Sequence, residues 1–198
     1  MRKIEKILIG THNIGKYKEI RDLLPKKVKK YYPQEFKILA PEETGNSFEE
    51  NSLIKASYFS KKTNLPCLSD DSGLEINILK GAPGIYSSRW SGKKNDFDLA
   101  IKKIFKEMNK IKKDWENEST ARFVCCLTLF LPNGQNYLGK GIVNGRISTQ
   151  KRGKNGFGYD PIFIPSGYEK TYGEMEPAHK MSIDHRYKAY LQIKKFFD

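Results

Sequence analysis

The sequence has few of the features that mark secreted, metal-stapled or membrane-spanning proteins. It contains only three cysteines in 198 residues, and two of them are neighbours at Cys125 and Cys126. Consecutive side chains on a strand point to opposite faces, which argues against a disulfide framework or a zinc site. No stretch approaches the roughly 20 apolar residues of a membrane span, so we expect no membrane partner. The stretch MRKIEKILIG lacks the cleavage site of a signal peptide, and we therefore expect a first strand there and a cytoplasmic protein.

Internal repeats, low-complexity linkers and sharp changes of composition are also missing. We therefore predict a single domain over residues 1–198, long enough to bury roughly 70% of its unfolded surface. Positive charge, in contrast, is abundant, because the formal net charge is +13. Such a charge favours polyanions, which include nucleic acids, anionic lipids and phosphorylated small molecules. Much of it lies in Lys-rich patches at 26–30 and 102–113, where a solvated helix face or loop is the simpler interpretation.

Apolar periodicity and turn residues predict a mixed α/β fold. Strands are expected at 6–10, 35–39, 65–70, 74–79 and 161–164, and helices at 16–24, 47–63, 96–113 and 182–197. The succession of the first strand, helix and second strand predicts a parallel strand pair. Ser47 and Glu50 form a capping-box pattern at the start of the second helix. Asn133-Gly134 lies between two β-prone stretches and is the strongest hairpin signal in the chain.

The stretch GTHNIGKY at 10–17 has the G-x-x-x-x-G-K spacing of a P-loop but carries Tyr17 where that motif has Ser or Thr. The P-loop hydroxyl binds Mg²⁺, and a phenol on a longer, rigid side chain cannot take its place, which excludes an NTPase P-loop. A strand that leads into a helix N-terminus still offers backbone N–H groups to phosphate, with Thr11, Asn13 and Lys16 beside them. An ordinary polar turn between strand and helix is an equal alternative.

Two acidic clusters could supply the oxygen ligands of a metal that accompanies phosphate, namely Glu42-Glu43 and Asp70-Asp71. Asp70 and Asp71 follow a short apolar run, where we expect a strand to end. Alternation along a strand lets at most one of the two point straight into a given cleft. One carboxylate could then hold a metal or activate water while its neighbour positions a cation. A strand-to-turn junction capped by Asp and Ser is the alternative.

Two further stretches place positive side chains where packing alone does not explain them. Helical spacing puts Lys55 on the same stripe as Phe48 and Phe59, so that it either reaches a phosphate or an aspartate or extends to the surface. His185 and Arg186 fall in the first turn of the last helix, where positive charge is disfavoured. Either an anionic ligand compensates for this conflict or the helix begins later.

The Gly-rich loop at 153–158 carries Phe157 and leads into Tyr159 and Asp160. An aromatic ring and a hydrogen-bonding side chain on such a loop suit a planar heterocycle, since one stacks on it and the other reads its edge. A hairpin that leads into Pro161 is the alternative.

Six stretches, in this order along the chain, resemble the inosine triphosphate pyrophosphatase family, also called the Ham1 or RdgB family. They are THNIGKYKEI, EETGNSFEENSLIKA, LSDDSGLEINILKGAPGIYSSRWSG, ARFVCCL, GFGYDPIF and KMSIDHR, and together they cover nearly the whole chain. The resemblance implies a mixed α/β fold with an elongated central sheet flanked by helices, two lobes around a nucleotide cleft, and a homodimer. It also implies Mg²⁺-dependent hydrolysis of ITP, dITP and XTP to the nucleoside monophosphate and pyrophosphate.

The resemblance further implies roles for individual residues. Asp71 would accept the proton of the attacking water, with Asp70 and Lys55 as supporting catalytic residues. Glu43 and Asp71 would hold the metal. The implied substrate-binding residues lie in the phosphate loop, after the aspartates, in the Gly-rich loop and near the C-terminus: Thr11, His12, Asn13, Ile14, Gly15, Lys16, Ser72, Phe157, Gly158, Tyr159, Asp160, Lys180, His185 and Arg186. Among them, the Phe157 to Asp160 run and Lys180 would contact the nucleoside. His185 and Arg186 would read the base.

One position departs from the family pattern, because His12 stands where the family commonly has Gly. A left-handed backbone at this position would disfavour His, so we expect a local adjustment without loss of activity. A Maf-like pyrophosphatase of other modified nucleotides resembles the family in fold and chemistry, but the GFGYDP and DHR motifs argue against it. A basic nucleic-acid-binding protein is a further alternative. Since the Lys clusters lie outside the motifs, we expect no specific binding of nucleic acid.

Overall fold

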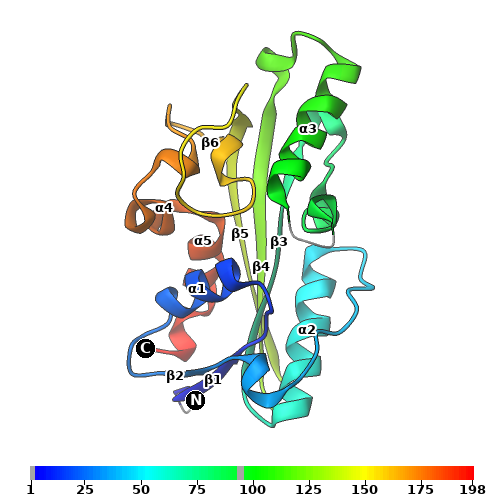
Figure 1. Cartoon of the computed structure of the whole chain (residues 1–198). Helices are drawn as coiled ribbons and strands as arrows, with labels where there is room; N and C mark the ends of the chain where they lie inside the picture. Colours follow the sequence, from blue (N-terminus) through cyan, green and yellow to red (C-terminus); the bar gives the residue numbers. More distant parts are fainter. Residues whose placement is uncertain (1–2, 93–95) are drawn as a thin grey trace. The chain divides into compact units, whose positions relative to one another are not determined.

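The computed structural model describes residues 3–92 and 96–198, and its strands form a six-stranded sheet in the order β2-β1-β3-β4-β5-β6 (Figure 1). The strands are β1 Lys6–Ile9, β2 Lys29–Tyr31, β3 Cys67–Ile76, β4 Thr120–Phe130, β5 Asn136–Ile147 and β6 Phe163–Pro165. The α-helices of the described residues are α1 Ile14–Leu23, α2 Phe48–Thr63, α3 Phe97–Ile111, α4 Pro177–Ile183 and α5 His185–Ile193. β1 pairs in parallel with β2 and β3, whereas β5 and β6 are antiparallel, so the predicted mixed α/β class is confirmed.

The predicted parallel start of the sheet is confirmed, but its second strand lies earlier than the predicted 35–39. Lys29–Tyr31 pairs with β1, whereas Pro33–Phe36 is a 3-10 helix and Lys37 has a left-handed φ of 55°. Pro33 favours the first turn of that helix, and the left-handed residue after it interrupts any extended path, so the apolar residues that follow do not join the sheet. Short strands that carry Lys are typical of a sheet edge, which explains why part of the Lys-rich patch forms β2.

The predicted strands 65–70 and 74–79 are one strand, β3, which is followed by a 3-10 helix at Asn77–Leu79. Asp70 and Asp71 therefore lie within a strand, so the predicted strand end is wrong, and so is the alternative of a capped turn. Ser72 and Gly73 are turn-forming residues, but β3 lies between β1 and β4 in the sheet. Pairing with neighbouring strands outweighs the weak local preference of two residues.

The predicted last helix, 182–197, covers the end of α4, the helix α5 and a 3-10 helix at Lys194–Phe196, and α4 and α5 are separated at Asp184. α4 ends at Ile183, Asp184 is extended with ψ 170°, and α5 begins at His185. The predicted place of His185 and Arg186 in a first helical turn is therefore confirmed. The predicted strand 161–164 begins at Phe163, because Asp160–Ile162 forms a 3-10 helix.

Local sequence signals are confirmed at the other helices and at the hairpin. Ser47 caps α2 by accepting a hydrogen bond from Glu50 N–H at 3.1 Å, and the Glu50 side chain reaches back to Asn46 N–H at 2.7 Å. α1 ends at Leu23, two residues before Pro25, and α3 covers the predicted Lys-rich helix. Gly134 takes a φ of 89° in the turn that joins β4 to β5. None of the helices within the described ranges combines the length and the apolar character that crossing a bilayer requires.

The chain forms two compact units, each assembled from separate stretches. The first unit contains Met1–Asp71, Cys125–Gly141 and His185–Asp198, and the second contains Ser72–Val124 and Ile142–Asp184. The single domain over residues 1–198 stays a prediction.

Within the first unit, the alternation of side chains along β1 sorts the helices by face. Ile7 and Ile9 share a buried cluster with Ile20 of α1 and Ala189 of α5, whereas Leu8 packs against Phe59 of α2. Helices α1 and α5 therefore cover one face of this part of the sheet and α2 covers the other, as Figure 1 shows.

Candidate active site

The predicted phosphate loop lies between β1 and α1 and is held by its own polar side chains. Thr11 Oγ1 accepts a hydrogen bond from Asn13 N–H at 3.1 Å. Asn13 caps α1 by accepting one from Lys16 N–H at 3.0 Å. The backbone N–H groups of Ile14 and Gly15 begin the helix and donate to no acceptor among the described residues. Two N–H groups and the positive end of a helix dipole are thus available to an anion.

Asp70 lies at the centre of a buried ion network in the first unit. Its side chain is 0% exposed, and its Oδ1 lies 3.0 Å from Lys16 Nζ. Its Oδ2 accepts hydrogen bonds from Arg186 Nη2 at 2.8 Å and Nε at 3.2 Å. Arg186 also pairs with Glu19 of α1. Burial acts to raise the pKa of Asp70, but Lys16 and Arg186 outweigh it and hold this pKa well below its usual range. Asp70 is therefore an ionised anchor for two cations and not a proton acceptor.

Asp71 meets a different environment, since adjacent side chains on a strand diverge. The residue is 5% exposed, and its Oδ1 accepts a hydrogen bond from Lys55 Nζ at 3.1 Å. Its Oδ2 is buried and has no hydrogen-bond partner within the described residues. Burial raises the pKa of Asp71 above its usual value, and Lys55 and Lys16 only partly offset this effect. The pKa values of two neighbouring aspartates are thus shifted in opposite directions, which is typical of groups that have different tasks in one site.

Lys55 bridges the two predicted metal ligands. It projects from α2 with 7% of its surface exposed and pairs with both Glu43 and Asp71. Burial acts to lower the pKa of Lys55, but Asp71 and Glu43 raise it above its usual value, so the ammonium stays charged. Of the two orientations left open for Lys55, the inward one is present, and its partners are Asp71 and Glu43. Glu43 and Asp71 are the carboxylates that could hold a cation here.

The second unit gathers the residues predicted to contact a nucleoside. Asp160 Oδ2 accepts a hydrogen bond from Phe157 N–H at 2.9 Å and lies 3.5 Å from Lys180 Nζ. The Lys180 ammonium lies 5.8 Å from the centre of the Phe157 ring. A side chain at Gly156, where φ is 74°, would place its Cβ 2.0 Å from Asp160 Oδ2, so only glycine allows this loop to close on Asp160. The loop thus presents an aromatic ring beside a paired cation and anion.

Tyr159 and Ser72 occupy other environments in the second unit. The Tyr159 hydroxyl donates to the Ser87 carbonyl at 2.8 Å, its ring packs edge-on against Phe97, and burial raises its pKa. Tyr159 therefore supports the loop from the core side. Ser72 follows Asp71 on β3 and is half-buried.

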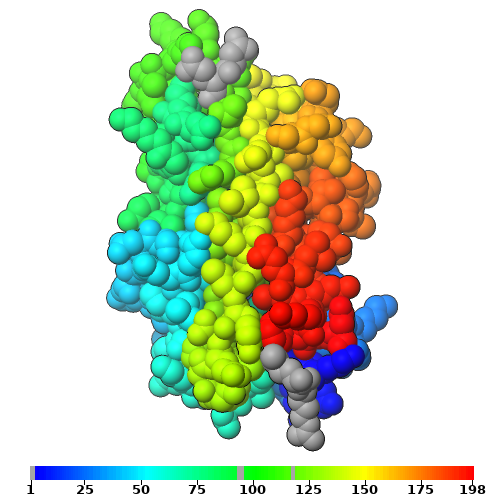
Figure 2. All heavy atoms as spheres, turned by 180° about the vertical axis from the view of Figure 1, so that it is seen from behind, coloured from blue at the N-terminus to red at the C-terminus, as the bar shows by residue number. Residues whose placement is uncertain are grey.

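His185 and Arg186 are placed by a close approach of α5 to β5. Figure 2 shows the surface of α5 alongside that of β5 in the first unit. A Cβ on Gly141 would lie 1.9 Å from the His185 carbonyl oxygen, and one on Gly139 would lie 2.1 Å from that of Ala189. Only glycine permits this contact. Arg186 is 1% exposed, and its contacts with acidic side chains supply the compensation for which an anionic ligand was predicted.

Glu19 is the partner that the sequence analysis missed. It lies three residues after Lys16 on α1, one helical turn away, and pairs with Arg186. The i, i+3 spacing from a predicted phosphate ligand was the only signal that could have identified it, and it does not reveal Arg186 as the partner.

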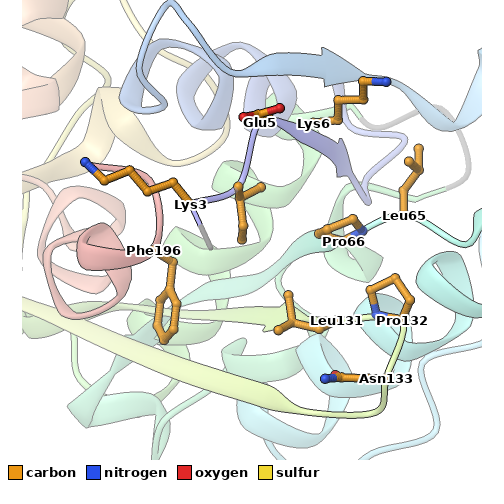
Figure 3. Close-up of a pocket in the computed structure, with 10 residues that line it drawn as sticks. Lys3, Glu5, Lys6, Leu65, Pro66, Leu131, Pro132, Asn133 and Phe196 are labelled. Atoms are coloured by element: carbon orange, nitrogen blue, oxygen red, sulfur yellow. The ribbon is translucent and has the colours of Figure 1, made fainter. Parts of the chain in front are cut away.

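A pocket of about 690 Å³ in the first unit does not coincide with this ion network (Figure 3). Apolar side chains that include Leu65, Leu131 and Phe196 line it. The charged residues Lys3 and Glu5 line it as well. It contains none of the predicted site residues. Lys6, which begins β1, also lines this pocket, whereas the phosphate loop follows the other end of that strand.

Comparisons with known proteins agree over nearly the whole chain. Residues 7–196 match the profile of the Ham1 family. The dITP/XTP pyrophosphatase of Rhodospirillum centenum is 42% identical, over 94% of this chain and 92% of its own length, and that of Caulobacter vibrioides is 41% identical, over 96% of each. A HAM1 protein structure from Coxiella burnetii matches with a TM-score of 0.86 and 36% identity, covering 97% of this chain and 98% of its own. The Staphylococcus aureus Ham1 protein matches with a TM-score of 0.83 and 34% identity, covering 96% and 97%.

Proposed function

Because the chain belongs to the Ham1 family, we propose that it hydrolyses the non-canonical purine nucleoside triphosphates dITP, ITP and XTP to the monophosphate and pyrophosphate. Relatives that share about two fifths of its residues carry the name dITP/XTP pyrophosphatase. The observation that carries the proposal is the pair Asp70-Asp71. One carboxylate is held ionised by Lys16 and Arg186, and the other has a raised pKa and a buried oxygen to which no described residue donates a hydrogen bond. Such a division suits a site that binds polyanions and activates water.

The phosphate loop is the proposed site of the triphosphate. The N–H groups of Ile14 and Gly15 offer two donors at a helix N-terminus, and the Lys16 ammonium stands beside Asp70. Backbone donors at a helix start favour phosphate without a P-loop hydroxyl, so the presence of Tyr17 does not weaken this assignment. Thr11 and Asn13 hold the loop in shape, and His12 adds a further anchor that is described below.

The residues present fit a magnesium ion. Asp71 Oδ2 is a buried oxygen to which no described residue donates a hydrogen bond, and the Glu43 carboxylate approaches the same ammonium as Asp71. Within the described ranges, no group of three or more His, Cys, Asp or Glu could hold a metal. Mg²⁺ is commonly bound through one or two carboxylates together with water and substrate phosphates, so two carboxylates suffice. We propose Glu43 and Asp71 as its ligands, and the bound ion would neutralise phosphate charge and polarise a P–O bond.

The proposed reaction is an attack of water on the α-phosphorus. A new P–O bond forms, the bond to the oxygen that bridges to the β-phosphorus breaks, and pyrophosphate leaves with the bonding electrons. Asp71 is proposed to take the proton of the water, because its buried Oδ2 accepts no hydrogen bond from the described residues. Lys16 and Lys55 stabilise the negative charge that develops on the phosphate oxygens.

Base selection is proposed to rest on donors that face the 6-oxo group of hypoxanthine and xanthine. Lys180 is the candidate donor and Phe157 offers a ring for stacking, both in the second unit. The family resemblance also implies a role for His185 in reading the base. A 6-amino group donates where a 6-oxo group accepts, so bound ATP would leave buried donors of the site unpaired. A site of this kind can favour the 6-oxo substrate over ATP by about 10⁴-fold or more. Tyr159, Gly158 and Asp160 are proposed to shape the same loop.

Pyrophosphate release from ITP, XTP, GTP and ATP, each with Mg²⁺ and with EDTA, tests the proposal. We expect release that requires the metal and favours ITP and XTP by orders of magnitude. Equal rates on all four substrates, or no release from any of them, would refute it. Binding to a random oligonucleotide, measured at two salt concentrations, tests the alternative of a nucleic-acid-binding protein. That alternative predicts that the affinity falls steeply as the salt concentration rises.

We also propose a homodimer in the cytoplasm. The dimer is what the family resemblance implies, and sedimentation equilibrium would measure its mass against that of the 22.9 kDa chain. All three cysteines are free thiols, which agrees with a reducing compartment.

A further inference from the structure

His12 makes two contacts from the phosphate loop to residues 32–38, a segment with no predicted role in the site. Its ring nitrogen Nε2 lies 3.0 Å from the carbonyl oxygen of Ile38. Its backbone carbonyl accepts a hydrogen bond from the Tyr32 hydroxyl at 3.2 Å. The ring centre also lies 6.4 Å from that of Tyr32 and 5.8 Å from that of Phe59. His12 thus joins the loop to a neighbouring turn by both its side chain and its backbone.

The hydrogen bond to Ile38 determines which nitrogen of the His12 ring carries a hydrogen. A carbonyl oxygen can only accept, so Nε2 carries the hydrogen and donates it. The backbone of His12 is not left-handed, since the non-glycine residues with positive φ in the described ranges are Lys37, Asn64 and Lys80. The predicted need for a local adjustment at this position therefore does not arise. The loop does not require glycine here, and a side chain at this position is free to act.

The segment that receives the contact is closed by hydrogen bonds of its own. Ile38 N–H donates to the Pro33 carbonyl at 3.2 Å, and Lys37 N–H donates to the Gln34 carbonyl at 3.1 Å. Tyr32 N–H donates to the Glu35 side chain at 2.7 Å. A turn closed by its own hydrogen bonds presents the Ile38 carbonyl in a defined place. His12 therefore anchors the phosphate loop to a preformed support.

We propose that His12 is a positioning residue that holds the phosphate loop in its binding shape before the triphosphate arrives. This inference rests on the proposed function of the same loop. The N–H groups of Ile14 and Gly15 come directly after His12 and Asn13, so a loop that moved at His12 would carry them away from a common target. With the anchor in place, the loop is ordered when the protein folds. Binding of the triphosphate then carries no further entropy cost for ordering the loop, which raises the affinity. His12 acts on the phosphates and not on the base, so its effect is equal for every nucleoside triphosphate.

The test compares three single variants of the full chain. His12→Phe keeps a ring and removes the donor, whereas His12→Gln keeps an amide N–H that can reach the Ile38 carbonyl. His179→Phe is the matched control, because His179 is exposed in the second unit. For His12→Phe we expect the KM for ITP and XTP and the Kd of inorganic tripolyphosphate in EDTA to rise together by about fivefold to tenfold, the size expected for one hydrogen bond. The kcat should stay within about twofold, because a preorganised loop adds binding and not chemistry.

His12→Gln should recover most of the lost affinity, and His179→Phe should match the wild-type protein. An unchanged tripolyphosphate Kd in His12→Phe overturns the proposal, as does a KM that rises for one base and not for the other. If His12→Phe fails to fold by circular dichroism, Tyr32→Phe takes its place, since it removes only the hydroxyl that donates to the His12 carbonyl. A weaker affinity for tripolyphosphate supports the proposal there, and an unchanged one overturns it. The tripolyphosphate assay does not depend on turnover. It therefore tests the role of His12 even if the protein hydrolyses no nucleotide and the proposed function fails.

Discussion

Replacing Asp70 by Asn removes the negative charge that Lys16 and Arg186 share. Asn has the same shape as Asp, so the perturbation is electrostatic. Asp70 is completely buried, and the two cations lie 3.0 Å and 2.8 Å from its oxygens. In the variant, the buried Arg186 keeps its contact with Glu19, and the half-buried Lys16 loses its ion pair.

The size of the effect follows from burial. Removing one partner of a buried ion pair costs about 3–5 kcal/mol, because the other charge is left without compensation. A pair about 3 Å apart at an effective dielectric of about 20 gives a Coulomb energy of the same order. Glu19 continues to balance Arg186, so we expect a loss of about 3 kcal/mol in the free energy of unfolding, at the lower end of that range. A domain is stable by about 5–15 kcal/mol, which makes this a large fraction of the total.

Urea denaturation at pH 7 measures the change, with Asp22→Asn as the control. Asp22 also binds an arginine, since Arg21 Nε lies 2.7 Å from its Oδ1, but both side chains are nearly half exposed. An exposed pair of this kind contributes about 1 kcal/mol or less. A loss below about 1 kcal/mol in Asp70→Asn, equal to that of the control, would show that the buried network contributes no more than a surface pair.

The same variant predicts a pH dependence with a definite sign. The pKa of Asp70 is lower in the folded protein than the value of about 3.9 that an unfolded chain has. Its contribution to stability is therefore complete above about pH 4 and is lost as the pH falls further toward the folded pKa. The difference in unfolding free energy between the wild-type protein and Asp70→Asn should be constant from pH 7 to about pH 5 and should shrink below about pH 4. A difference that is independent of pH down to about pH 3 would contradict the assignment of Asp70 as the ionised anchor.

Three further predictions concern the proposed chemistry. Asp71→Asn should lower kcat for ITP by about 10²-fold or more because it removes the proton acceptor, while its urea midpoint stays close to that of the wild-type protein; near-normal turnover would remove Asp71 from the reaction. Lys55→Met leaves two carboxylates facing each other without the ammonium, so Mg²⁺ should raise its melting temperature more than that of the wild-type protein, and equal shifts in a thermal assay would argue against a metal at these carboxylates. Gly141→Ala must displace α5, and we expect about 1–3 kcal/mol of destabilisation together with a lower ratio of ITP to ATP turnover. Gly145→Ala, whose Cβ would lie 2.3 Å from a β6 carbonyl in the second unit, should lose stability and keep that ratio; a ratio that falls equally in both variants would contradict the positioning role of Gly141.

Local signals were sufficient for the elements that depend on neighbours in sequence. The Ser47 cap of α2 and the Asn133-Gly134 hairpin involve hydrogen bonds between residues a few positions apart, and both are confirmed. The same reasoning failed at residues 35–39, where β-propensity is real but Pro33–Phe36 forms a 3-10 helix and Lys37 is left-handed. It also failed at Ser72 and Gly73, where strand pairing extends through residues that resemble a turn.

The sequence by itself determined the chemical inventory of the site. A strand followed by a polar loop and a helix, two adjacent aspartates and an inward lysine are all readable in one dimension, and so is the family to which they belong. Their spacing indicates phosphate and a divalent cation, because those ligands require backbone N–H groups, ammonium groups and carboxylate oxygens.

Only the tertiary structure decided how the surroundings of the two aspartates differ. Asp70 and Asp71 are chemically identical neighbours, and their opposite pKa shifts arise from partners far away in the chain, since Arg186 is 116 residues from Asp70. A sequence pattern records which groups exist, whereas burial and charge proximity exist only after the chain has brought distant segments together. The anchor of His12 on Ile38 and the contact of Glu19 with Arg186 were decided in the same way.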